Sequence, residues 1–255
     1  MNPAVQVGEL IALAAWSFTV STAGGLVGLV LGNLRLPLVV LLASSPAAGA
    51  GANVAVSGAA AVTAATTHAR AGRVNWRIFA WMAPTSLAGG IAGGLISGAL
   101  PDRLLLGIIA LAVLYGALEV IRYRGPRDER ETPRRHLLAK AAGIGFGIGL
   151  LGGVVGLILG SLRLPAMVRW VSVGPYAAVG TNAAVGMAVA IGGLLGHLPS
   201  GVDWDLLAAG APAAVLGAYV GSRLTGRLEE DALLRAIAGI LIVSGLALLV
   251  QAIVG

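Results

Sequence analysis

The chain has 255 residues and a mean hydropathy of +0.90; 57% of the residues are hydrophobic and only 11% are charged. Soluble domains carry about 25% charged residues, so the 17 basic and 11 acidic side chains are too few to cover a water-soluble fold. The composition predicts an all-α polytopic membrane protein. It disfavours soluble enzymes, nucleic-acid-binding modules and, since there is no cysteine, secreted disulfide scaffolds.

The apolar stretches are long enough to cross a hydrocarbon core of about 30 Å, which takes roughly 20 helical residues. Two apolar stretches, about 10–45 and 138–173, are too long for one membrane crossing but short for two. Each is interrupted in its middle by glycine, arginine and proline, together with asparagine in the first stretch and serine in the second. Each predicts a broken helical hairpin that enters the membrane and turns back. The remaining stretches predict single transmembrane helices near 46–67, 78–99, 104–122, 175–197, 204–224 and 233–254.

A charged, proline-containing segment divides the chain. It predicts a first membrane repeat over 1–122, a cytoplasmic basic linker over 123–137 and a second membrane repeat over 138–255. Seven of the 17 basic residues fall between Arg122 and Lys140, as the positive-inside rule expects of a cytoplasmic loop. The net charge of +6 therefore indicates membrane orientation rather than a nucleic-acid partner.

The two halves are copies of one unit. Residues 24–37 read GGLVGLVLGNLRLP and residues 152–165 read GGVVGLILGSLRLP, and these are identical at 11 of 14 positions. Polar, aromatic and proline residues continue the correspondence at a spacing of 128 or 129 residues. The pairs are Pro46 and Pro175, Gly51 and Gly180, Asn53 and Asn182, His68 and His197, Trp76 and Trp204, and Pro84 and Pro212. Chance matching of apolar residues does not produce such a series, so the chain contains a duplication.

Equivalent loops of the two copies carry opposite charge. The loop HARAGRVNWR (68–77) contains three arginines, whereas its counterpart HLPSGVDWD (197–205) contains two aspartates and no Lys or Arg. The next pair of loops reverses the bias, with Arg103 in the first copy but Arg223 and Arg227 in the second. Because basic loops stay on the cytoplasmic side, the copies are predicted to be inverted repeats.

Arg35 and Arg163 lie at equivalent positions inside otherwise uncharged apolar stretches, in the interrupted part of each predicted hairpin. Inserting an arginine at the membrane centre costs a free energy of roughly 2.5–3.5 kcal/mol on insertion scales. Its presence at the same position in both copies therefore indicates a functional role. Inverted copies would bring the hairpin tips together, and each guanidinium could bind an oxyanion through two hydrogen bonds. The alternative is that each side chain reaches the headgroups or caps carbonyls of its own hairpin.

The breaks in the hairpins predict a second kind of anion contact. Unwound backbone is tolerated at membrane depth only where protein or a water-filled cavity satisfies it, and the N-terminus of a half-helix offers N–H groups to an anion. Gly32 with Asn33, and Gly160 with Ser161, lie beside these breaks and are candidate substrate contacts. Close helix packing is the alternative role for the glycines.

New helices are predicted to start at Ser44-Ser45-Pro46 and at Gly174-Pro175, with proline in the first turn. Asn53 and Asn182 then lie one or two turns inside these helices, where an amide contacts either a substrate oxygen or a neighbouring helix. Five hydroxyl side chains are candidates for donating a hydrogen bond to an oxyanion: Ser44, Ser45, Ser161, Ser172 and Thr181. The alternative is that each one forms a hydrogen bond with the backbone of its own helix.

His68 and His197 correspond across the repeat and are candidates for a proton relay, although both lie at predicted span ends, where histidine is more often an ordinary boundary residue. The sequence offers no clustered His, Cys or carboxylate spacing for a metal ion, and no cofactor is predicted. Carboxylates lie near segment ends, so the sequence shows no acid well inside the membrane for proton or sodium coupling.

Both halves also resemble the sulfite exporter TauE/SafE family of membrane transporters. The resemblance rests on the Gly-rich start of each half, the proline that follows, the stretches Gly51-Ala52-Asn53 and Gly180-Thr181-Asn182, and the Val-Asn/Asp-Trp loops. It implies a duplicated, multi-pass protein of the bacterial inner membrane. It also implies transport of sulfite, thiosulfate, organosulfonates or related anions.

Residues and resemblance together predict a transporter of small sulfur-containing oxyanions that works by alternating access at a midplane site between the repeats. The expected partners are the small anionic substrate and the lipid bilayer, with no nucleic acid, and a homo-oligomer is left open. The alternatives are a channel-like or scaffolding membrane protein and a transporter of another small organic anion. An intramembrane enzyme is disfavoured because the sequence lacks a buried catalytic acid, base or metal set.

Overall fold

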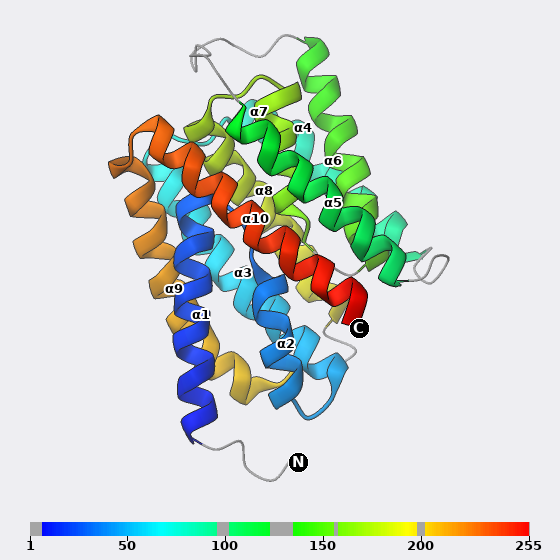
Figure 1. The fold of residues 1–255 in the computed structure, drawn as a ribbon, viewed down its shortest axis with the longest axis vertical. Helices are drawn as coiled ribbons and strands as arrows, with labels where there is room; N and C mark the ends of the chain where they lie inside the picture. Colours follow the sequence, from blue (N-terminus) through cyan, green and yellow to red (C-terminus); the bar gives the residue numbers. More distant parts are fainter. Residues whose placement is uncertain (1–6, 96–101, 123–134, 156–157, 198–201, 255) are drawn as a thin grey trace.

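The computed structural model describes residues 7–95, 102–122, 135–155, 158–197 and 202–254, which form helices and no strand (Figure 1). The first half contributes α1 (Val7–Val27), α2 (Gly32–Leu42), α3 (Pro46–Arg70), α4 (Trp76–Leu95) and α5 (Asp102–Ile121). The second half repeats this order with α6 (Arg135–Val155), α7 (Gly160–Trp170), α8 (Pro175–His197), α9 (Trp204–Leu224), the short 3-10 helix η2 (Thr225–Arg227) and α10 (Glu230–Val254). The predicted all-α class is confirmed.

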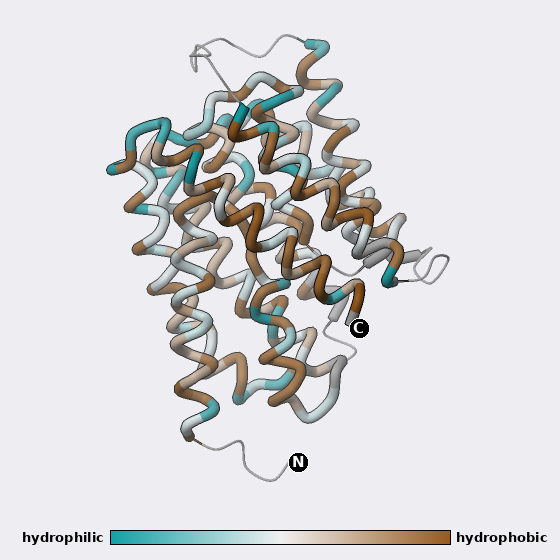
Figure 2. The backbone as a smooth tube through the Cα atoms, in the orientation of Figure 1, coloured by the Kyte–Doolittle hydropathy of each residue, from teal (hydrophilic) through white to brown (hydrophobic). Residues whose placement is uncertain are grey.

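The lengths and composition of the helices suit a membrane. Among the described residues, four helical stretches are long and apolar enough to cross one: Val7–Val27, Ala48–Arg70, Trp204–Arg227 and Glu230–Ile253. The helices α4, α5, α6 and α8 have 20, 20, 21 and 23 residues, and 20 residues correspond to about 30 Å of helix. Hydrophobic residues run along the helices, and hydrophilic residues gather mainly near their ends (Figure 2). The chain is a multi-pass membrane protein.

Each predicted hairpin consists of one long and one short helix. The helix α1 has 21 residues and α2 has 11, and α6 and α7 repeat these lengths. In Figure 1, α2 runs back toward the end of the molecule at which α1 begins. The first arm of the leading hairpin is thus long enough to cross the membrane by itself, while the returning arm covers only about half of that distance.

The position of the break differs from the prediction. The chain leaves the helix at residues 28–31, and Arg35 and Pro37 lie inside α2 instead of on unwound backbone. Gly28 adopts a φ of +66°, a conformation that favours glycine. A Cβ at this position would collide with the carbonyl oxygen of Val179 in α8. The break therefore occurs where two backbones make contact.

Pro37 is accommodated inside α2 by a distant helix. A proline has no N–H to donate to the carbonyl four residues earlier, which here belongs to Asn33. Gln251 of α10 donates from Nε2 to that carbonyl oxygen at 3.3 Å, and Nδ2 of Asn33 donates to Oγ of Ser244 at 3.1 Å. The half-helix continues through the proline because α10 satisfies the freed carbonyl.

Eight of the described helices pack in pairs that join the two halves. The helix α1 packs against α9, and its counterpart α6 packs against α4; α3 packs against α8, and α5 against α10. This pattern is unchanged when every helix is replaced by its counterpart, as a two-fold relation between the copies requires. In Figure 1, α1 begins at the lower end of the molecule and α6 at the upper end. Inversion across a membrane stays a prediction, as do the repeat boundaries; residues 123–134 of the linker lie outside the described residues.

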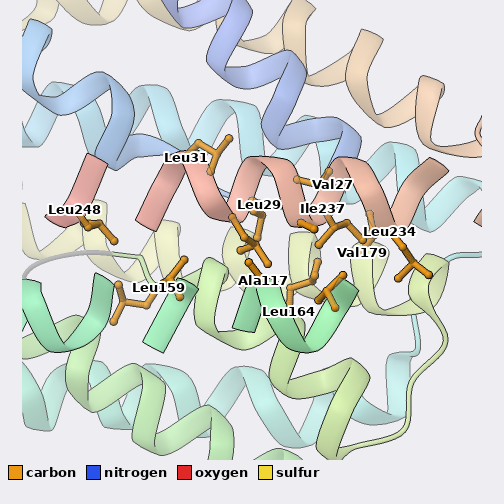
Figure 3. Close-up of a cluster of buried hydrophobic side chains, with 14 of the residues drawn as sticks. Val27, Leu29, Leu31, Ala117, Leu159, Leu164, Val179, Leu234, Ile237 and Leu248 are labelled. Carbon is orange, nitrogen blue, oxygen red and sulfur yellow. The ribbon is translucent and has the colours of Figure 1, made fainter. Parts of the chain in front are cut away.

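A hydrophobic cluster packs around the two breaks (Figure 3). It brings Leu29 and Leu31 of the first break together with Leu159 at the second. Val179 of α8 and Ile237 of α10 are fully buried in the same cluster. The apolar contacts hold the starts of α2 and α7 in place inside the molecule.

Candidate anion-binding site

Arg35 of α2 is 1% exposed and is bound by two polar residues of α3. Its Nε donates to Oδ1 of Asn53 at 3.0 Å, and its Nη2 donates to Oγ of Ser57 at 2.6 Å and to the carbonyl oxygen of Asn53 at 3.3 Å. The Asn53 amide donates in turn to the carbonyl oxygen of Gly32 at 3.1 Å. This network fixes both the guanidinium and the start of α2 on α3.

The second half repeats the Arg–Asn pair. Nη1 of Arg163 donates to Oδ1 of Asn182 at 3.4 Å. Nδ2 of Asn182 donates to the carbonyl oxygen of Gly160 at 3.2 Å, as Asn53 does to Gly32, and also to the carbonyl oxygen of Gly28 at 2.8 Å. Asn182 therefore holds the start of α7 and the break of the other half at the same time.

The two arginines differ in how completely they are satisfied. The residue that corresponds to Ser57 in the second copy is Gly186, which has no hydroxyl to offer. Arg163 is 1% exposed, and its Nε is one of three buried side-chain polar atoms without a hydrogen-bond partner in the described part of the chain, together with Oγ of Ser17 and Oγ of Ser86. The sequence repeat is close to symmetric, but the polar network is not.

A small pocket lies against Arg35. Ser21 and Gly25 of α1 and Ser57 of α3 line it together with Arg35, and small side chains complete its walls: Ala60, Ala61, Ala64, Ala183 and Ala218. The rest of the lining is apolar, with Val20, Leu29, Val30 and Leu31.

A second small pocket shares Gly32 and Ser57 with the first. It is lined by Asn33 at the start of α2 and by Leu159 and Ser161 at the start of α7. This pocket therefore lies between the N-termini of the two half-helices, one from each copy, and neither Arg35 nor Arg163 is part of its lining.

The lining of these pockets favours an anion. Leu31 and Leu159 precede α2 and α7 without a side-chain cap hydrogen bond, so the positive end of each helix dipole is left without a side-chain acceptor. Oγ of Ser57 accepts from Arg35, which leaves its O–H able to donate. A Cβ on Gly32 would lie 2.6 Å from that oxygen, so glycine permits the close approach. The described lining of both pockets contains no carboxylate.

The other predicted hydroxyls lie outside these two networks. The backbone N–H of Ser44 donates to Asp203 at 3.1 Å, and Ser45 caps α3 by accepting from the N–H of Ala48 at 3.1 Å. Ser172 is exposed in the turn after α7, and its φ is +61°. Thr181 is buried and accepts from the N–H of Asn75 at 2.8 Å. The helix starts predicted at Pro46 and Pro175 are confirmed.

His68 is fully buried, although its place near the end of α3 indicates a boundary residue. Its Nε2 lies 3.0 Å from the carbonyl oxygen of Gly25 and must donate to it, which makes Nδ1 the acceptor for Nη1 of Arg73 at 3.4 Å. The same Arg73 nitrogen donates to the carbonyl oxygen of Ser222 at 2.9 Å. Burial lowers the pKa of the Arg73 guanidinium. The counterpart His197 ends α8, and its side chain lies outside the described residues.

A protein-family model described as "Sulfite exporter TauE/SafE" matches residues 13–248. The match includes both hairpins and both Arg–Asn pairs, so it rests on both copies of the repeat. Comparisons of the chain with curated proteins and with solved structures gave no match.

Proposed function

The chain belongs to the sulfite exporter TauE/SafE family of membrane transporters, and from this premise we propose that it carries small sulfur oxyanions through the pockets beside Arg35. Sulfite, thiosulfate and organosulfonates are the expected substrates. The observation that carries the proposal is a buried guanidinium that lines one pocket, next to a second pocket that lies at the starts of the two half-helices and shares Gly32 and Ser57 with the first. A cation would be repelled there, and a neutral solute would leave the buried charge uncompensated.

The proposed binding contacts follow from the donors that line the pockets. An oxyanion accepts from Arg35, from the O–H of Ser57 and from backbone N–H groups at the starts of α2 and α7. Asn53 and Asn182 act as positioning residues, because their amides hold the two helix starts. Asn33 and Ser161 complete the polar wall between the half-helices.

We also propose that the halves are inverted repeats in the bacterial inner membrane, with the basic linker on the cytoplasmic side. The opposite charges of equivalent loops support this orientation, and so does the exchange of equivalent helices in the packing. Alternating access then consists of one half moving against the other around the shared site.

Such a cycle requires a barrier between the pocket and each side of the membrane. Ala64 and Ala218 line the Arg35 pocket, and His68 and Ser222 follow them by one helical turn on α3 and α9. His68 bonds to α1 through Gly25, and Arg73 bonds to Ser222. We propose that these contacts close the pocket at its cytoplasmic end.

Replacing Arg73 with Gln should open this end of the pocket. A hydrogen bond from a charged group contributes about 1.5–3 kcal/mol, so its loss should raise the population of the open state at least about tenfold. Since the chain has no cysteine, a single Ala64→Cys reports access through the rate of modification by a membrane-impermeant maleimide. The matched control is Arg77→Gln, whose arginine is exposed; equal rates in wild type and R73Q would contradict the barrier.

The proposed function is tested by anion binding and uptake with purified full-length protein. At least one of sulfite, thiosulfate, sulfoacetate and taurine should raise the thermal unfolding temperature and enter proteoliposomes, because binding to the native state stabilises it. Choline and glycerol serve as cationic and neutral controls. If none of the four binds or is taken up, the channel-like or scaffolding alternative replaces the proposal.

A further inference from the structure

A groove runs along the face of α7 that carries Leu162, Pro165 and Arg169. Its lining differs from that of the anion pockets because it is mostly apolar. The groove lies among α5, α6 and α7. Its floor is apolar, with Ala112 and Gly116 of α5, Ile148 of α6 and Leu162 and Pro165 of α7. The helices α5 and α7 touch at Gly116, where a Cβ would lie 2.8 Å from Cγ of Pro165. Small residues beside this contact leave the groove unfilled.

One end of the groove is basic. Arg169 lines it, and its Nε donates to Oε2 of Glu119 at 2.7 Å. The two side chains are 56% and 18% exposed, so the guanidinium is the more exposed member of the pair, and the carboxylate lines the groove beside it. A guanidinium has five N–H groups, and this ion pair uses only the one on Nε. Arg122, which is exposed, follows Glu119 by three residues and continues the same face of α5.

The basic end lies where the membrane surface is expected. Arg122 directly precedes the linker that is predicted to be cytoplasmic, and Trp170 of the groove wall is exposed. Tryptophan is enriched at headgroup level. Basic pockets between transmembrane helices on this side are suited to anionic lipid headgroups.

We infer that the groove is a binding site for one anionic phospholipid. An acyl chain lies along the apolar floor, and the phosphate pairs with Arg169 and Arg122 at the cytoplasmic surface. Charge complementarity selects a lipid over a second copy of the chain, since a copy would need to present acidic residues at the depth of Arg169. This inference is independent of the transported substrate.

The test measures lipid retained by purified full-length protein in native mass spectrometry after titration with phosphatidylglycerol or phosphatidylcholine. Wild type should retain phosphatidylglycerol preferentially. Arg169→Gln should lower its retention about fivefold and leave phosphatidylcholine unchanged, whereas Glu119→Gln should raise phosphatidylglycerol retention by removing the competing carboxylate. Arg77→Gln, which alters an exposed arginine on α4, is the matched control and should behave as wild type.

A groove-filling variant separates the acyl-chain contact from the headgroup contact. Ala112→Trp should lower the retention of both lipids, because the indole occupies the space of the chain. Equal phosphatidylglycerol retention in wild type and R169Q would overturn the inference. The inference would also be overturned if A112W retained both lipids but changed the number of protein copies in the assembly. That result would identify a second copy of the chain as the occupant of the groove. The R169Q comparison stands alone if A112W does not fold.

Discussion

Replacing Arg35 with Gln should abolish the binding of sulfite-like anions and leave a folded protein. The substitution removes the charge that lines the pocket and the donors to Asn53 and Ser57. Two charge-assisted hydrogen bonds to the anion, at about 1.5–3 kcal/mol each, correspond to an affinity loss of roughly a hundredfold or more. Isothermal titration with sulfite and uptake into proteoliposomes measure the effect.

The fold should survive because removing a buried charge also removes its desolvation cost. Arg77→Gln is the control for a general effect of losing an arginine, since Arg77 is exposed. Arg163→Gln is expected to abolish binding as well, because Arg163 bonds to Asn182, which holds the start of α7. Unchanged uptake in both R35Q and R163Q would remove the support for an arginine-based site.

Gly28→Ala should destabilise the protein more than the same change at another glycine with the same backbone conformation. A left-handed residue with a Cβ costs roughly 1–2 kcal/mol, and the collision with the carbonyl of Val179 in α8 adds about 1–3 kcal/mol of overpacking. The expected total is about 3 kcal/mol. Thermal unfolding in detergent, followed by circular dichroism, measures the difference.

Gly72→Ala is a matched control within the same chain. Gly72 has a φ of +69°, close to the +66° of Gly28, but a Cβ there would meet nothing within 4 Å. Only the conformational cost applies, so the loss should stay near 1 kcal/mol. Equal losses in G28A and G72A would show that the contact between the break and α8 does not stabilise the fold.

The repeat made part of the site predictable. Arg35 and Asn53 are matched by Arg163 and Asn182, which made all four candidate site residues, although the bonds between them were not predicted. The structure joins them directly. The helix starts at Pro46 and Pro175 could also be predicted from the sequence, because proline in the first turn of a helix is a local signal.

Other features depend on contacts that sequence spacing does not reveal. Ser57 was missed, although it lies one turn after Asn53 and so on the same face of α3; its lack of a counterpart in the second copy removed the repeat signal. The break was predicted over the stretch from Gly32 to Pro37, because glycine and proline normally interrupt a helix, but the chain leaves the helix at residues 28–31. The residue that makes Pro37 tolerable, Gln251, lies in the last helix, far beyond the reach of any local pattern.

The pairing of α1 with α9 bears on how the protein is made. Their seam is narrow, because a Cβ on Gly25 of α1 would lie 2.5 Å from the carbonyl oxygen of Ala218 in α9, so the fit forms only once both helices are present. The ribosome finishes α1 long before it reaches Trp204. Until α9 is made, the glycine face of α1 lacks the partner that it contacts in the folded protein.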